Sequence, residues 1–127
     1  MHQQICHLGR YHEVFLERLD QILHGPSPPK MERYRAEDDP QWPAWMRLSP
    51  DDALERFRNL RTKLIRELDG CSSSDWARTG AHPALGEMTL RKWVEFFLVH
   101  EAHHIYNMMF TKSAAKERPG GLSIRAS

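Results

Sequence analysis

Hydrophobic residues recur at helical spacing in three long stretches of the chain. In the first, residues 5–25, Leu8, Phe15, Leu19 and Ile22 fall at i, i+7, i+11 and i+14. These positions share one stripe of an α-helix. Gly25 and the proline-rich residues after it are typical of a helix end. The pattern therefore predicts an amphipathic helix near the start of the chain.

The second stretch carries the strongest helix signals. Ser49 stands where a helix N-cap is expected, Pro50 at the first helical position, and Asp51 and Asp52 face the positive end of the helix dipole. These residues predict a helix that begins after Ser49 and ends at Gly70. Its apolar positions are Leu54, Phe57, Leu64, Ile65 and Leu68.

The third stretch, residues 90–110, is apolar nearly all round and follows Thr89, a favourable N-cap residue. A helix of this kind is typically buried, so we expect it to be central to the domain.

The two connections between these helices differ in character. Residues 26–48 have no sustained period and contain five prolines, which predicts a long connection. Trp42 and Trp45 within it are expected to pin it onto the body, because exposed indoles are unfavourable in water. Residues 71–88 predict a second connection with one helical turn around 74–77, and we find no strand with convincing alternation.

Composition narrows the class of protein. The 127 residues fit one domain, which we place at 1–112, followed by a flexible polar tail at 113–127. The formal charge of +1 and the lack of a basic block argue against a nucleic-acid partner. No apolar run is long enough to span a membrane, and no secretion signal begins the chain. Cys6 and Cys71 do not form a disulfide framework, so we expect a cytoplasmic protein.

The third stretch also holds the candidate chemistry, in the sequence His100-Glu101-Ala102-His103-His104. On a helix, His100 and His104 lie one turn apart on one face, whereas Glu101 points about 100° away. Two neutral imidazoles at this spacing can share one divalent ion such as zinc, nickel or iron. A third ligand must come from elsewhere. His7, on the flank of the first apolar stripe, is the candidate, and His12 is its rival.

These histidines allow two other interpretations. They could be hydrogen-bonded members of the core, since buried imidazoles need partners. The same residues also match the H-E-x-x-H pattern of zinc proteases. That pattern is short, no histidine follows His104, and no strand precedes the helix to align a peptide. We therefore interpret the protease match as a coincidence within a His-x-x-x-His pair.

Several separate motifs together resemble one known family, the DinB-like metal-binding four-helix proteins. The run "CHLGRYHEVFLERL" is similar to the second helix of that family. A tryptophan, a Gly-x-His-Pro turn, a G-x-x-T-L helix start and His-x-x-His-His resemble its C-terminal half. The matches span about residues 4 to 111 in the family's order. Asn107 stands where the family usually has glutamine, and His82 lies in the turn, where we expect a structural role.

The resemblance implies a fold and a metal site. The fold is an all-α, up-down-down-up bundle, of which this chain carries three main helices and lacks the N-terminal one. Carried over residue by residue, the resemblance makes His7, His100 and His104 the metal ligands. It implies that Asn107 and His103 support these ligands without binding the metal themselves, and it gives Glu101 no catalytic role.

The resemblance also implies functions. One is a metal- and thiol-dependent S-transferase or hydrolase, which acts on a small molecule with a low-molecular-weight thiol as cosubstrate. The alternative is a non-catalytic stress-response or dimerisation module. Because a missing helix would leave part of the core uncovered, we expect a homodimer.

Overall fold

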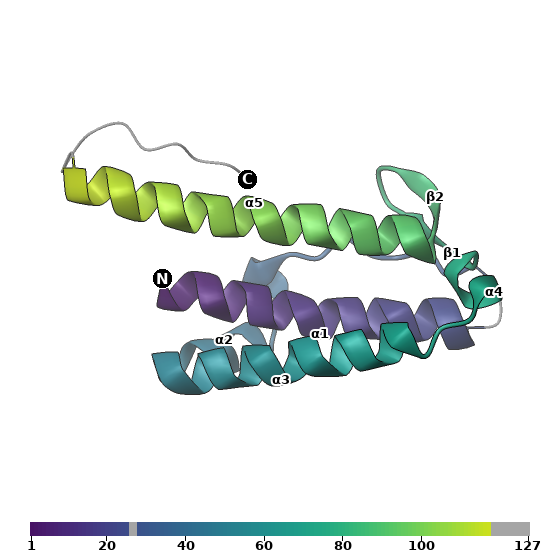
Figure 1. The fold of residues 1–127 in the computed structure, drawn as a ribbon, viewed down its shortest axis with the longest axis horizontal. Helices are drawn as coiled ribbons and strands as arrows, with labels where there is room; N and C mark the ends of the chain where they lie inside the picture. The colour runs from purple at the N-terminus through teal and green to yellow at the C-terminus, as the bar shows by residue number, and fades with distance from the viewer. Residues whose placement is uncertain (26–27, 118–127) are drawn as a thin grey trace.

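Three long helices form the body of the protein. The computed structural model describes residues 1–25 and 28–117, and the side chains of these up to Phe110. The long helices are α1 (His2–His24), α3 (Pro50–Asp69) and α5 (Leu90–Glu117). Helix α1 lies between the other two; α3 runs parallel to it and α5 antiparallel (Figure 1). The predicted all-α bundle is therefore confirmed.

The parallel arrangement of α1 and α3 explains the long connection between them. A helix of 23 residues is about 34 Å long, so the chain must travel back along it before α3 can begin. This return segment, residues 25–49, contains the short 3₁₀ helix η1 (Ala36–Asp38) and the helix α2 (Trp42–Met46). The connection was predicted, whereas these two short helices were not.

Trp45 fixes the return segment to α1, as the sequence predicts. Its side chain is fully buried, and its indole Nε1 donates a hydrogen bond to Glu13 Oε1 at 2.7 Å. The ring lies against Gly9, where an added Cβ would come within 2.2 Å of it. Arg56, which belongs to α3, holds its guanidinium 4.6 Å from the centre of the Trp45 ring. Gly9, a poor helix former, is thus required by the close approach of the indole.

Helix α3 begins as predicted but buries a narrower face than predicted. The Ser49 hydroxyl accepts a hydrogen bond from the backbone N–H of Asp52 at 3.1 Å, which confirms the N-cap. Leu64 is buried, whereas Ile65 is 50% exposed, so the expectation for Ile65 was wrong. The reason is that α3 borders α1 on one side only.

Helix α5 is also less buried than its sequence suggests. Thr89 caps it, accepting a hydrogen bond from the Lys92 N–H at 3.2 Å. Trp93 and Phe97 face the core, but its other side is open to solvent. The exposed apolar residues there are Leu98, Val99, Ile105, Tyr106 and Met109. The expectation that this helix is central was wrong, because α1 takes that place. The helix continues to Glu117, into the expected tail, and positions 118–127 lie outside the described residues.

A small hairpin at one end of the bundle corrects the expectation of a strand-free chain. After the one-turn helix α4 (Ser73–Trp76), strands β1 (Thr79–His82) and β2 (Gly86–Thr89) pair antiparallel. Four-residue strands are too short for alternation to reveal them. The Trp93 indole donates to the Gly80 carbonyl at 3.1 Å and so ties the hairpin to α5. None of the described helices has the length and hydropathy needed to cross a membrane.

The close contact between Gly9 and the Trp45 ring predicts that a larger residue at position 9 destabilises the protein. Gly9→Ala should lower the free energy of unfolding by about 1–3 kcal/mol, because the new methyl group overlaps the indole. This loss should exceed the helix-propensity gain of about 1 kcal/mol. Urea unfolding measures the change. Gly70→Ala is the matched control, since its Cβ would meet its nearest neighbour at 3.5 Å. Equal stabilities of the two variants would contradict this packing.

Candidate metal site

Three histidines from two helices come together at the seam between α1 and α5. His7 comes from α1 and His100 and His104 from α5, and one ring nitrogen of each lies within 4.8 Å of the others. The Nε2 atoms of His100 and His104 are 3.2 Å apart. The His7 ring centroid lies 4.5 Å from that of His104. The structure therefore brings together the set that the resemblance implied.

The geometry of this cluster fits a divalent metal ion. Two imidazole nitrogens bound to one tetrahedral zinc at about 2.0–2.1 Å lie about 3.3 Å apart. The separation between His100 and His104 is already close to this value, at 3.2 Å. One ring nitrogen of His7 lies within 4.8 Å of the nitrogens of this pair and is the third nitrogen of the set.

Electrostatics keep these imidazoles neutral at physiological pH. Burial, and then the neighbouring histidines His104 and His7, lower the pKa of His100 to about 4. Burial followed by His7 and His103 lowers the pKa of His104 to about 4 as well. Burial also lowers the pKa of His7. Neutral imidazole is the form that binds a metal, so the ligands need no deprotonation at neutral pH.

His12 and Glu101, the other candidates near this cluster, are engaged elsewhere. The Nδ1 of His12 lies 2.8 Å from the Leu8 carbonyl, and its Nε2 accepts a hydrogen bond from Arg61 Nε at 2.9 Å. Both ring nitrogens are thus occupied, which removes His12 as the third ligand. Glu101 pairs with the Arg61 guanidinium and is not part of the three-histidine cluster.

Comparison with known proteins agrees with this geometry. A family model described as the DinB superfamily matches residues 1–108. The chain belongs to the DinB superfamily. Among curated proteins, none matches its sequence.

One solved structure shows how far the fold of this DinB-superfamily chain is shared. It is described as "YfiT from Bacillus subtilis is a probable metal-dependent hydrolase with an unusual four-helix bundle topology". The TM-score is 0.64 at 22% sequence identity, and the match covers 82% of this chain and 59% of YfiT. This likeness establishes the helical bundle fold. The chain spans about three-fifths of the length of the YfiT chain.

Aromatic side chains form walls around the histidines of this DinB bundle. The Tyr11 ring stacks on His100 at 4.1 Å between centroids, with 26° between the planes. Trp42 and His7 make an edge-to-face contact, with 6.1 Å between the ring centroids. Sequence reasoning assigned Trp42 only to holding the return segment. Its place beside His7 could not be foreseen, because it depends on the path by which that segment returns.

His103 and Asn107, the two residues expected to support the metal ligands, both lie on α5. The ring of His103 is 6.1 Å from that of His104, and its Nε2 is buried without a hydrogen-bond partner in the described part of the chain. Asn107 follows His104 by three residues and is partly buried. Their support of the metal ligands stays a prediction.

Two further residues singled out in the sequence have structural roles. Cys6 is fully buried, its thiol donates to the Trp45 carbonyl at 3.3 Å, and burial raises its pKa. The ring of His82 accepts the backbone N–H groups of Ala84 and Leu85, both at 3.0 Å. The interpretation of His82 as a structural turn histidine is confirmed.

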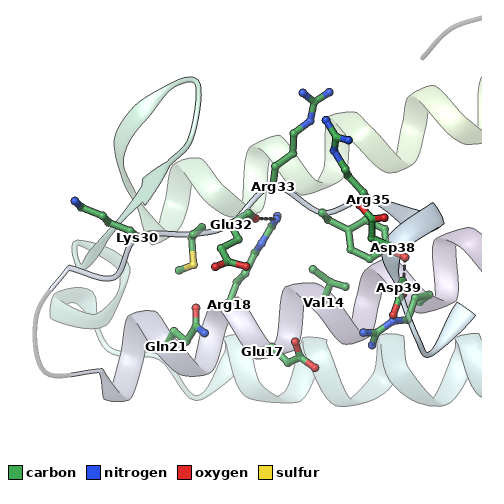
Figure 2. Close-up of a pocket in the computed structure, with 13 residues that line it drawn as sticks. Val14, Glu17, Arg18, Gln21, Lys30, Glu32, Arg33, Arg35, Asp38 and Asp39 are labelled. Atoms are coloured by element: carbon green, nitrogen blue, oxygen red, sulfur yellow. Dashed lines mark hydrogen bonds and ion pairs between the residues drawn. The ribbon is translucent and has the colours of Figure 1, made fainter.

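A separate groove of about 540 Å³ lies between α1 and the return segment (Figure 2). Along it, Arg10 Nε and the Tyr34 hydroxyl donate to Asp39 at 2.6 and 2.7 Å. Burial alone would raise the pKa of Asp39, but these bonds lower it. None of the lining residues is a histidine. The groove is therefore distinct from the candidate metal site.

Arg18 links this groove to the histidines. Its side chain extends from α1 to the Glu32 carbonyl, to which it donates at 3.0 Å (Figure 2). It is buried, and among the described residues it forms no ion pair with a carboxylate. It donates to the Tyr11 hydroxyl at 3.4 Å, behind the ring that stacks on His100. Its positive charge also helps to lower the pKa of His100.

The shifted histidines predict how the metal-free protein responds to acid. Between pH 4 and about 6.5, unfolded histidines bind protons that folded His100 and His104 do not. The free energy of unfolding should therefore fall as the pH drops from 6.5 towards 4 and stay level above 7. Urea titrations at several pH values measure it. The double variant His100→Gln/His104→Gln should show a shallower fall, and an unchanged slope would contradict the assignment.

Proposed function

We propose that this chain binds a divalent zinc, nickel or iron ion through His7, His100 and His104. The observation that carries this proposal is the meeting of three neutral imidazoles within 4.8 Å at a partly buried helix seam. Membership of the DinB superfamily supports it, as does the likeness to YfiT, described as a probable metal-dependent hydrolase. A cytoplasmic location stays a prediction.

We further propose that the bound metal serves a thiol S-transferase or a hydrolase. A divalent ion held by neutral ligands lowers the pKa of a bound water or thiol and so supplies a nucleophile at neutral pH. The chain's own part is to hold the ligands at the seam and to limit water with Tyr11 and Trp42. In S-transfer, the thiolate sulfur forms a bond to an electrophilic carbon while the leaving group departs with its electron pair.

Charge favours a negatively charged cosubstrate for this reaction. The ion would add two positive charges near the ring of Tyr11, whose hydroxyl accepts a hydrogen bond from Arg18. Among the described residues, Arg18 forms no ion pair with a carboxylate. A low-molecular-weight thiol that carries acidic groups, bound as its thiolate, matches this potential.

The protease alternative finds no support in the position of Glu101. A zinc protease needs that carboxylate free beside the metal-bound water as a general base. Here the carboxylate is 7% exposed and pairs with Arg61.

Metal content tests the proposal directly. Protein purified without a histidine tag should contain close to one zinc, nickel or iron ion per chain by elemental analysis. His7→Ala and His104→Ala should each lose most of it, because two imidazoles hold an ion far more weakly than three. His24→Ala is the matched control, an exposed histidine on the same helix as His7. Metal that survives in the His7 variant would contradict the ligand set.

The same proteins test the reaction. The metal-loaded chain should consume a thiol such as cysteine in the presence of a chlorinated aromatic or an epoxide, and the His104→Ala variant should not. A metal-loaded protein with no turnover across electrophiles and esters would reject catalysis while leaving metal binding intact.

The second candidate function is a non-catalytic dimerisation module, for which the outer face of α5 is the relevant observation. Its apolar residues, 40–70% exposed, recur at helical spacing along about 17 Å of helix. They are Leu98, Val99, Ile105, Tyr106 and Met109. Since the positions between 98 and 109 on this face carry no charge, we propose that a second copy of the chain covers it. A two-fold interface places such a face against itself and needs no complementary charges.

Disruption of this face tests the dimer. The unmodified protein should have the mass of two chains by size exclusion with light scattering, and Val99→Lys/Met109→Lys should have the mass of one. Ile65→Lys, on the exposed side of α3, should stay dimeric. A monomeric parent protein, or a double variant that remains dimeric, would contradict the interface.

A further inference from the structure

A buried polar network joins the three long helices beside the metal site. Arg61 of α3 donates through Nε to His12 of α1 at 2.9 Å and through its terminal nitrogen to the Glu101 carboxylate of α5. His12 is 1% exposed and Glu101 7%. Both residues belong to sequence patterns named above: His12 is the rival third ligand, and Glu101 is the glutamate of the H-E-x-x-H pattern. The proposed function uses neither of them.

The hydrogen bonds of His12 within this network are complete. Because Arg61 Nε can only donate, His12 Nε2 must accept, so the proton lies on Nδ1 and is donated to the Leu8 carbonyl at 2.8 Å. Phe57 and Phe97 pack against the imidazole with centroids 4.8 and 4.9 Å away. In this geometry both ring nitrogens of the buried His12 are satisfied, and the buried Glu101 carboxylate is paired with Arg61, whose side chain is 33% exposed.

Apolar packing alone does not define the rotation of α5 about its own axis. This helix carries large apolar residues on the inner face, such as Trp93 and Phe97, and also on the outer face, such as Val99 and Met109. A rotation by one residue position, about 100°, would exchange one apolar set for another and carry His100 away from α1. Glu101 is the buried charged residue of α5 within its described side chains, whereas Arg91, Lys92 and Glu95 are exposed. It therefore marks the face that must turn inward.

Two residues of the network lie on the same helices as the proposed metal ligands, a few positions away from them. Glu101 adjoins His100 and precedes His104 by three residues, and His12 follows His7 by five. When Glu101 is held against Arg61 and His12, His100 is set on Tyr11 and His104 is set beside His7.

We propose that His12, Arg61 and Glu101 are positioning residues that set the rotation of α5 and so assemble the three-histidine site. This inference rests on the proposed metal function. A buried ion pair adds little net stability over a well-packed apolar replacement, but it can specify one arrangement among several. The network should therefore matter more to the affinity for metal than to folding.

An apolar replacement separates these two effects. In the variant His12→Leu/Arg61→Leu/Glu101→Leu no buried charge remains unpaired, so urea unfolding should stay close to that of the parent. Its zinc dissociation constant, from competition with a chromophoric chelator, should rise by about tenfold or more. Lys92→Leu/Glu95→Leu removes an exposed ion pair from the same helix and should leave the zinc affinity unchanged. Unchanged zinc affinity in the network variant would overturn the proposal.

A measurement without metal distinguishes failure of this proposal from failure of the metal site. In the metal-free parent and the Lys92/Glu95 control, stacking at 4.1 Å should give a nuclear Overhauser effect between the Tyr11 and His100 rings. The network variant should lose it. If the parent binds no zinc, the proposed function fails, and the ring contact still decides the positioning role. A contact that persists in the variant would overturn that role.

A milder variant covers the case in which the triple variant does not fold. Glu101→Gln keeps the shape of the side chain but removes the charge that pairs with Arg61. It should weaken both zinc binding and the Tyr11–His100 contact, and Glu101→Asp, which retains the charge, should restore part of each. No change in either measurement with Glu101→Gln would contradict the proposal.

Discussion

The packing of α5 against α1 is the contact on which the rest of this structure depends. Phe97 lies 4.6 Å from Phe15 and 5.8 Å from Tyr11 between ring centroids, and these rings set the two helices in antiparallel contact. The helices are rigid, so the same seam continues one turn further, where His100 stacks on Tyr11. The candidate metal site is in this sense an extension of the aromatic core. Its ligands occupy positions that would otherwise hold further apolar residues.

The parallel arrangement of α1 and α3 imposes a second constraint. It requires a return segment as long as a helix, and that segment must be held to the body. Trp45 does so against Gly9, and Trp42, three residues earlier, thereby lies beside His7. The residues that connect the helices thus also form one wall of the site.

Local signals allowed much of this to be predicted. The caps at Ser49 and Thr89 and the i, i+4 pair of histidines depend only on neighbours within one helix, and the structure contains all of them. Spacing could not decide between His7 and His12 as the third histidine, since both lie near the same stripe of α1. That choice depends on Arg61, which comes from another helix and occupies the ring of His12.

Burial was the property that sequence predicted least well. The exposure of Ile65 and of the outer face of α5 reflects how many neighbours each helix has, which its own composition does not reveal. The paired strands β1 and β2 were missed because four residues are too few to show alternation. The pattern H-E-x-x-H misleads because the glutamate pairs with Arg61, a residue of another helix that the pattern does not contain.

X-ray absorption at the zinc edge of the zinc-loaded protein tests the central claim most directly. We predict three imidazole nitrogens at about 2.0–2.1 Å, with a light oxygen ligand in the remaining position. A sulfur shell near 2.3 Å would instead implicate Cys6 or Cys71 and contradict a site built from His7, His100 and His104.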